Sequence, residues 1–125
     1  MPRDPRTLLP LKPLVFHLLV ALLDGDRHGW SLLRATEAQP DLGRVMPAQL
    51  YRQMASMLDE GLVTEHDAPA ASSKPEPEST TGGARPRRFF RLTAFGRAVA
   101  RAEAQRLTEA VADARVQSLL SRTRS

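Results

Sequence analysis

Gln49, Arg52 and Gln53 lie close together in residues 47–60, where the spacing of apolar residues predicts a helix. A glutamine side chain can form two hydrogen bonds to adenine, and an arginine side chain can form two to guanine, at the base edges that the major groove exposes. Tyr51 can donate to a phosphate or pack against the preceding helix, and the sequence leaves both roles open. We therefore favour contact with base pairs here over the simpler interpretation of a solvated helix face.

Four arginines surround a short predicted strand in the second half of the chain: Arg85, Arg87, Arg88 and Arg91. Side chains alternate between the two faces of a strand, so Arg87 and Arg91 lie opposite Arg88 and not all four can touch one partner. We expect Arg85 and Arg87 to bind phosphate, with Arg88 as a further candidate. Arg88 or Arg91 can instead pair with acids of the protein body, and a solvated charged strand is the remaining interpretation.

Positive charge is concentrated towards one end of the chain. The formal net charge is +4, yet residues 1–67 hold seven basic and nine acidic residues, whereas residues 85–125 hold ten arginines and three acids. Such asymmetry favours a polyanionic partner. Of the 18 basic residues only Lys12 and Lys74 are lysine, and arginine suits DNA because it contacts phosphate and guanine bidentately. A genome-wide compositional bias would explain the arginine preference but not the clustering.

The residues that enzymes and metal sites need are sparse. The chain has no cysteine, which excludes disulfides and thiolate zinc sites. His17, His28 and His66 are scattered, with no carboxylates at metal-ligand spacing, and we expect His28 to begin a helix. The sequence contains no nucleophile elbow, P-loop or dinucleotide fingerprint. We therefore expect no catalytic residues, no metal and no cofactor.

A small, mainly helical domain must position these side chains. Apolar residues recur at helical spacing in three stretches, and Pro13 and Pro47 are well placed at helix starts. Shorter apolar runs predict two strands that form a β-wing, and Thr93 is a good N-cap for a final helix about 40 Å long. The predicted helices cover residues 13–23, 29–38, 47–60 and 94–120, and the predicted strands cover 62–65 and 87–92.

The remaining segments have compositions of their own. Residues 1–7 are polar and are expected to form a loose arm, and residues 67–84 lack large apolar side chains and are expected to be a mobile wing loop. In the second helix we expect Trp30 and Leu33 to face the core. The apolar stretch 8–23 is interrupted by polar residues and prolines and falls short of the roughly 20 apolar residues that span a bilayer. It predicts a buried helix, and hence a cytoplasmic protein without a membrane partner.

Three pieces of the sequence, in this order, resemble the PadR family of transcriptional regulators. They are LLDG (22–25) with HGW (28–30), LYR (50–52) with LDEGLV (58–63), and PRRFFRLTAFGR (86–97). Each piece alone is weak, but all three at plausible spacing are specific. The chain departs from the family pattern at Trp30, where tyrosine is usual, and at residues 46–49, so its base preference should differ.

The resemblance implies a winged helix-turn-helix domain over residues 8–93, followed by a dimerisation helix over residues 94–120. It implies a regulator, often a repressor, that binds a roughly palindromic operator as a homodimer. Some members respond to a small aromatic effector, although the last helix here has no tryptophan to bind one. The apolar stripe that we expect to form the dimer consists of Phe95, Val99, Ala102, Leu107, Ala110, Val111 and Ala114.

A second class of function stays open at this point. The same fold could serve as a protein-interaction module without DNA binding, with the acidic, proline-rich segment 67–84 as its docking element. An enzyme is a distant third. The salt dependence of DNA binding separates the first two, because neutralising phosphates gives a steep negative slope.

Overall fold

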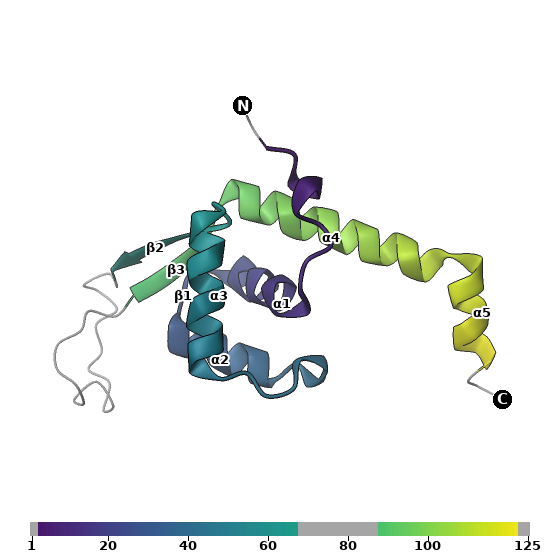
Figure 1. Ribbon diagram of the computed structural model, residues 1–125, viewed down its shortest axis with the longest axis horizontal. Helices are drawn as coiled ribbons and strands as arrows, with labels where there is room; N and C mark the ends of the chain where they lie inside the picture. The colour runs from purple at the N-terminus through teal and green to yellow at the C-terminus, as the bar shows by residue number, and fades with distance from the viewer. Residues whose placement is uncertain (1–2, 68–87, 123–125) are drawn as a thin grey trace.

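The computed structural model describes residues 3–67 and 88–122 (Figure 1). Helix α1 lies at the centre, in contact with α2 and α4, and α2 contacts α3. The short 3₁₀ turns are η1 (Pro5–Leu8), η2 (Leu22–Asp24) and η3 (Pro40–Leu42). The helices are α1 (Pro13–Ala21), α2 (Gly29–Glu37), α3 (Pro47–Asp59), α4 (Ala94–Ala112) and α5 (Ala114–Arg122), and the strands are β1 (Arg27–His28), β2 (Val63–Asp67) and β3 (Arg88–Leu92).

Each helix starts where local chemistry favours a start. Proline occupies the first position of α1 and α3, where its missing N–H has no partner to lose. The Nδ1 atom of His28 accepts from the backbone N–H of Ser31 at 3.2 Å, and this confirms the expectation that His28 begins the second helix. The Thr93 hydroxyl accepts from the N–H of Gly96 at 2.8 Å and caps α4 as predicted.

The sheet has three antiparallel strands in the order β1-β3-β2, where the sequence predicted two. In the extra strand, Arg27 pairs with Phe90 and His28 with Phe89. A two-residue strand has no alternation for a pattern to reveal, because it forms only when β3 offers its free edge. The two longer strands confirm the predicted wing, with Val63 opposite Leu92.

The core is built from leucines and methionines, with few aromatic side chains. Phe90 projects inward from β3 and is almost fully buried. Trp30 was expected to face this core, but 54% of its surface is exposed, so that prediction was wrong. Leu32 and Leu33 fill the inward positions of α2 instead. The large apolar side chains buried most completely are Leu18, Leu19, Leu32, Leu50, Met54, Met57, Leu62, Val63 and Val99.

The N-terminal arm packs against the body rather than hanging loose, from its first described residue onwards. Turn η1 lies on α4, and the guanidinium of Arg3 sits 4.6 Å above the centre of the Phe95 ring and donates to the Glu60 carbonyl. Farther along, the N–H of Leu11 donates to the Glu103 carboxylate at 3.3 Å. The prediction of a loose arm, which rested on polar composition, was therefore wrong, because cation–π and hydrogen-bond contacts hold the arm in place.

Glu103 is only 2% exposed and receives two hydrogen bonds from Arg106, at 2.7 and 2.9 Å, besides the one from Leu11. The Arg106 hydrogen bond holds the pKa of Glu103 below its usual value of 4.5, against the opposing effect of burial. A carboxylate with a lowered pKa stabilises the fold fully above its unfolded pKa. That contribution is lost as the pH falls from about 4.5 through the lowered value.

We expect Glu103→Gln to lower the free energy of unfolding at pH 7 by about 1–2 kcal/mol, because hydrogen bonds to a charged group are stronger than neutral ones. The variant should also lose less stability than the wild type between pH 4.5 and pH 3. Urea unfolding at several pH values measures both effects. Glu109→Gln, at an exposed position of the same helix, is the control. Equal losses in the two variants would contradict the role assigned to Glu103.

The predicted final helix is broken at Asp113, so residues 94–120 are not continuous. Asp113 has extended backbone angles (φ −55°, ψ 133°), and its carboxylate accepts from the N–H of Arg115 at 2.8 Å. Aspartate is a favoured N-cap, which allows a new helix to start here without glycine or proline. Figure 1 shows α5 turned away from the line of α4, at the end of the molecule farthest from the wing strands.

Candidate nucleic-acid interface

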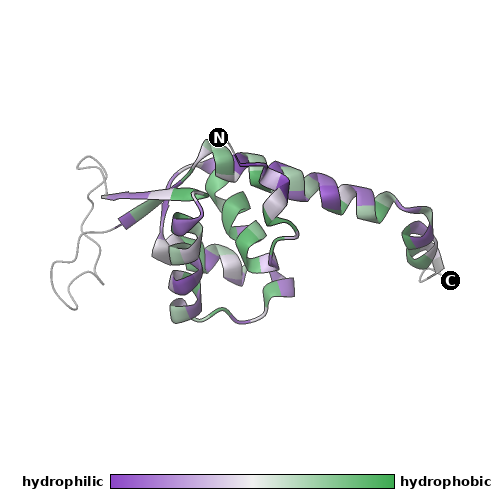
Figure 2. Cartoon of the chain, turned by 45° about the horizontal axis from the view of Figure 1, so that its top comes forward, coloured by the Kyte–Doolittle hydropathy of each residue, from purple (hydrophilic) through white to green (hydrophobic). Residues whose placement is uncertain are grey.

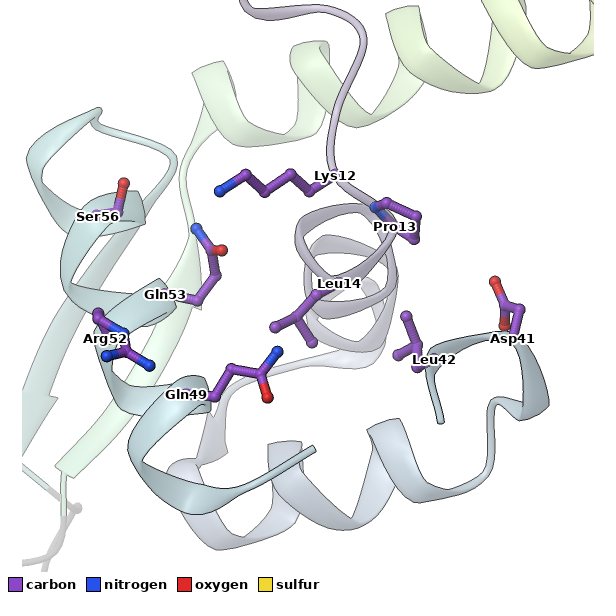
Figure 3. Close-up of a pocket in the computed structure, with 9 residues that line it drawn as sticks. All are labelled: Lys12, Pro13, Leu14, Asp41, Leu42, Gln49, Arg52, Gln53 and Ser56. Carbon is purple, nitrogen blue, oxygen red and sulfur yellow. The ribbon is translucent and has the colours of Figure 1, made fainter. Parts of the chain in front are cut away.

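The polar face of α3 borders a hollow between α3 and the start of α1. The cavity has a volume of about 600 Å³. Figure 3 shows Gln49 and Arg52 on the α3 side and Lys12 opposite them, with Leu14 of α1 between Lys12 and Gln49. The residues that line it are Lys12, Pro13, Leu14, Asp41, Leu42, Gln49, Arg52, Gln53 and Ser56.

Three of the predicted base-contacting residues therefore share one face of α3, namely Gln49, Arg52 and Gln53. Gln49 and Arg52 are exposed, and Arg52 has no ion-pair partner among the residues that the structure describes. An unpaired guanidinium on an open helix face is available to an external acceptor. The structure places these side chains together, but their contact with DNA stays a prediction.

Tyr51 lies on a different face of the same helix. Its ring covers Gly29 so closely that a Cβ atom on Gly29 would lie 2.6 Å from Tyr51 Cε1. The packing role left open by the sequence is therefore present. The side chain still exposes 49% of its surface, so a phosphate contact also stays open. Gly29 permits this approach because it has no side chain.

Two of the arginines at the wing strands pair with acids, which was the alternative to DNA contact for Arg88 or Arg91. Arg88 forms an ion pair with Glu65 at 3.3 Å, and Arg91 with Asp26 at 2.9 Å. The hydrogen bond from Arg91 holds the pKa of Asp26 below its usual value, with a smaller contribution from His66. Arg91 is thus committed to the body. Arg85, Arg87 and most of the predicted loop 67–84 lie outside the described residues.

Two histidines contact Phe89 on the outer face of the sheet. The His66 ring stacks on Phe89 at 6.1 Å between centroids, and His28 approaches it edge-on at 5.5 Å. Because these residues are direct partners across the three strands, only strand register could have revealed the cluster.

Among the described residues no group of three or more histidines and acids could hold a metal ion. Nor does this part of the chain contain a helix long and apolar enough to cross a bilayer.

The predicted dimerisation stripe divides into a buried part and an exposed part. Val99 is completely buried in the core of its own chain, and Phe95 packs partly against that core under Arg3. Leu107 and Val111 are 38% and 50% exposed, beyond the point where α4 leaves the body. Figure 2 shows apolar and polar residues alternating along this protruding part.

Comparisons with known proteins identify the fold. No protein-family model matches the sequence, and no curated protein matches it. A PadR family transcription regulator from Clostridium difficile matches with a TM-score of 0.63 and 12% identity, covering 91% of this chain and 100% of that one. RosR from H. salinarum matches with a TM-score of 0.57 and 20% identity, covering 93% of this chain and 96% of that one.

A structure of Bacillus subtilis PadR in complex with operator DNA also matches, with a TM-score of 0.53 and 19% identity. The match covers 78% of this chain and 48% of that one, so this chain spans about half the length of that protein. The C. difficile protein is described as a PadR family transcription regulator, and the B. subtilis protein as PadR bound to operator DNA. At these identities the likeness shows that the chain shares their fold.

Proposed function

We propose that this chain is a PadR-type transcriptional regulator that binds a roughly palindromic operator as a homodimer. The observation that carries the proposal is the polar face of α3, where Gln49 and the unpaired Arg52 stand together on a helix next to a β-wing. A recognition helix of this kind contacts bases through its N-terminal half, which is where both residues lie. No catalytic role is assigned to any residue.

The operator-bound PadR structure supports DNA as the partner, because this chain shares that protein's fold. The arrangement of charge supports it as well. Arg88 and Arg91 are neutralised at the wing strands, whereas Arg52 keeps its charge for an external acceptor. A protein that occupies an operator acts most simply by excluding other proteins from it, so we propose repression. A small aromatic effector rests on the resemblance to the family alone.

Arg52→Ala tests the base-reading role. We expect a loss of about 1–3 kcal/mol in binding to the preferred site, together with a blurred preference at one base position, because a bidentate contact to guanine is removed. Selection of sites from a random pool supplies the operator, and titrations on selected and random DNA give the two affinities. Arg97→Ala removes the same charge from an exposed position of α4. Equal losses on both DNAs would show that Arg52 reads no base.

A protein-interaction module is the second candidate, and the exposed Trp30 favours it. A tryptophan that leaves 54% of its surface open is unusual on a protein surface and common at protein–protein interfaces. The same titrations separate the two functions. Binding that is absent from every DNA at low salt would favour the module, whereas salt-dependent binding with sequence preference supports the regulator.

A further inference from the structure

Lys12 lines the cavity beside α3, and the sequence patterns assigned it no contact with DNA. Its side chain extends across the hollow towards Gln53 on α3, and Ser56 lies one helical turn beyond Arg52 (Figure 3). An ammonium group, an amide and a hydroxyl thus line one part of the cavity. All three can donate hydrogen bonds, and only the amide and the hydroxyl can accept them.

This part of the cavity carries an excess of positive charge. Neither Lys12 nor Arg52 has an ion-pair partner among residues 3–67 and 88–122. The one acid that lines the cavity, Asp41, lies on its other side and binds His17 at 3.1 Å. Two cations that share an open hollow repel each other, and an anion between them would remove that repulsion.

The backbone at Lys12 is held in place from both sides. The preceding residue, Leu11, donates its N–H to the buried Glu103, and the following residue, Pro13, begins α1 with a fixed φ angle. The Lys12 carbonyl accepts from the N–H of Phe16 at 3.1 Å. The base of the lysine side chain is therefore positioned before any ligand arrives, and only the flexible stem must be ordered on binding.

We propose that Lys12, together with Gln53 and Ser56, forms a binding site for a phosphodiester group of the DNA backbone. The site rests on the proposed function, and it adds a contact that neither α3 nor the wing provides. Amide and hydroxyl donors beside a lysine are the usual partners of phosphate oxygens. Gln53 is thereby assigned to the backbone, and Gln49 and Arg52 are left for the base edges.

The arrangement of the elements accounts for such a site. In Figure 1, α3 lies between the wing strands on one side and the start of α1 on the other. A helix in the major groove, which is about 12 Å wide, has one phosphate backbone on each side. The wing lies next to one backbone, and the Lys12 cavity is on the side of the other. Contacts on both sides would fix how the helix enters the groove.

Lys12→Gln tests the proposal, with Arg101→Gln on exposed α4 as the matched loss of one charge. We expect Lys12→Gln to weaken binding to selected and random DNA alike, by about eightfold per half-site at 0.1 M salt, and to reduce the salt slope by about 0.9 per half-site. Lys12→Arg should retain most of the slope. Thermal unfolding checks that each variant is folded, and because Lys12 is exposed its substitution leaves the core intact.

A scan with single methylphosphonates, which neutralise one phosphate at a time, locates the contact. At one phosphate per half-site the neutral group should weaken the wild type but have no further effect on Lys12→Gln. If Lys12→Gln behaves like Arg101→Gln, or if no phosphate shows this coupling, the site is wrong while the regulator stands. If the wild type binds no DNA at any salt concentration, the proposed function fails and this site fails with it.

Discussion

Replacing Val111 with glutamate is expected to turn the proposed dimer into a monomer and to weaken binding to an operator with two half-sites by about 100-fold or more. Val111 and Leu107 form an exposed apolar pair on α4, beyond the part of the helix that packs on its own domain. A carboxylate at the centre of such a contact would be desolvated without a partner. Two linked half-sites typically gain 10²–10⁴ in affinity, and that gain disappears when the link is lost.

Sedimentation at micromolar concentration and titrations on full and half operators measure the two effects together. The control is Gln105→Glu, which adds the same charge to an exposed position outside the predicted stripe. A wild type that sediments as a monomer, or a Val111→Glu variant that stays dimeric, would show that this stretch of α4 is not the interface. Half-operator binding should be the same in the wild type and the variant, since each recognition helix is unaltered.

Replacing Gly96 with alanine is expected to destabilise the fold by about 3 kcal/mol. Gly96 is buried in the first turn of α4, and an added Cβ would overlap the carbonyl oxygen of Leu62 and lie 2.9 Å from Leu92 Cδ1. The carbonyl is backbone and accepts from the Thr93 N–H, so it cannot move aside cheaply. Overpacking of this kind costs about 1–3 kcal/mol and occasionally more.

The sign of the change in the free energy of unfolding distinguishes overpacking from helix propensity. Helix propensity alone would make glycine to alanine stabilising by about 1 kcal/mol. Ala104→Gly, at an exposed position of the same helix, calibrates that propensity in this protein. Urea unfolding gives both values. An increase in stability in Gly96→Ala would mean that the α4 start and the α3–β2 turn do not press against each other as closely as the structure places them.

Much of the architecture follows from local signals in the sequence. The apolar spacing and the prolines at positions 13 and 47 give the first and third helices within two residues, and Thr93 gives the start of α4. The face shared by Gln49, Arg52 and Gln53 follows from helical periodicity. These features depend on residues a few positions apart, which is the range over which sequence patterns carry information.

The features that the sequence did not reveal depend on contacts between distant segments. Strand β1 exists only because β3 lies beside it, and Trp30 faces outward because Leu32 and Leu33 already fill the space inside. The position of Lys12 beside the polar face of α3 depends on how α1 packs opposite α3, which the sequence does not show. The break at Asp113 is different, because an aspartate N-cap is a local signal that the apolar stripe around it obscured.

The junction at Thr93 affects which spacing between two operator half-sites a dimer of this chain would fit. The Thr93 N–H donates to the Leu62 carbonyl at 3.1 Å, and its hydroxyl donates to the Gly61 carbonyl at 2.6 Å, so the start of α4 is tied to the end of α3 through one turn. Because these hydrogen bonds link the two helices, we expect a tilt of α4 to turn α3 with it. In the proposed dimer, the crossing angle of the two α4 helices would then set the separation of the two recognition helices. The spacing between half-sites that the dimer tolerates would therefore report that crossing angle. This spacing can be measured in solution by lengthening or shortening the operator one base pair at a time.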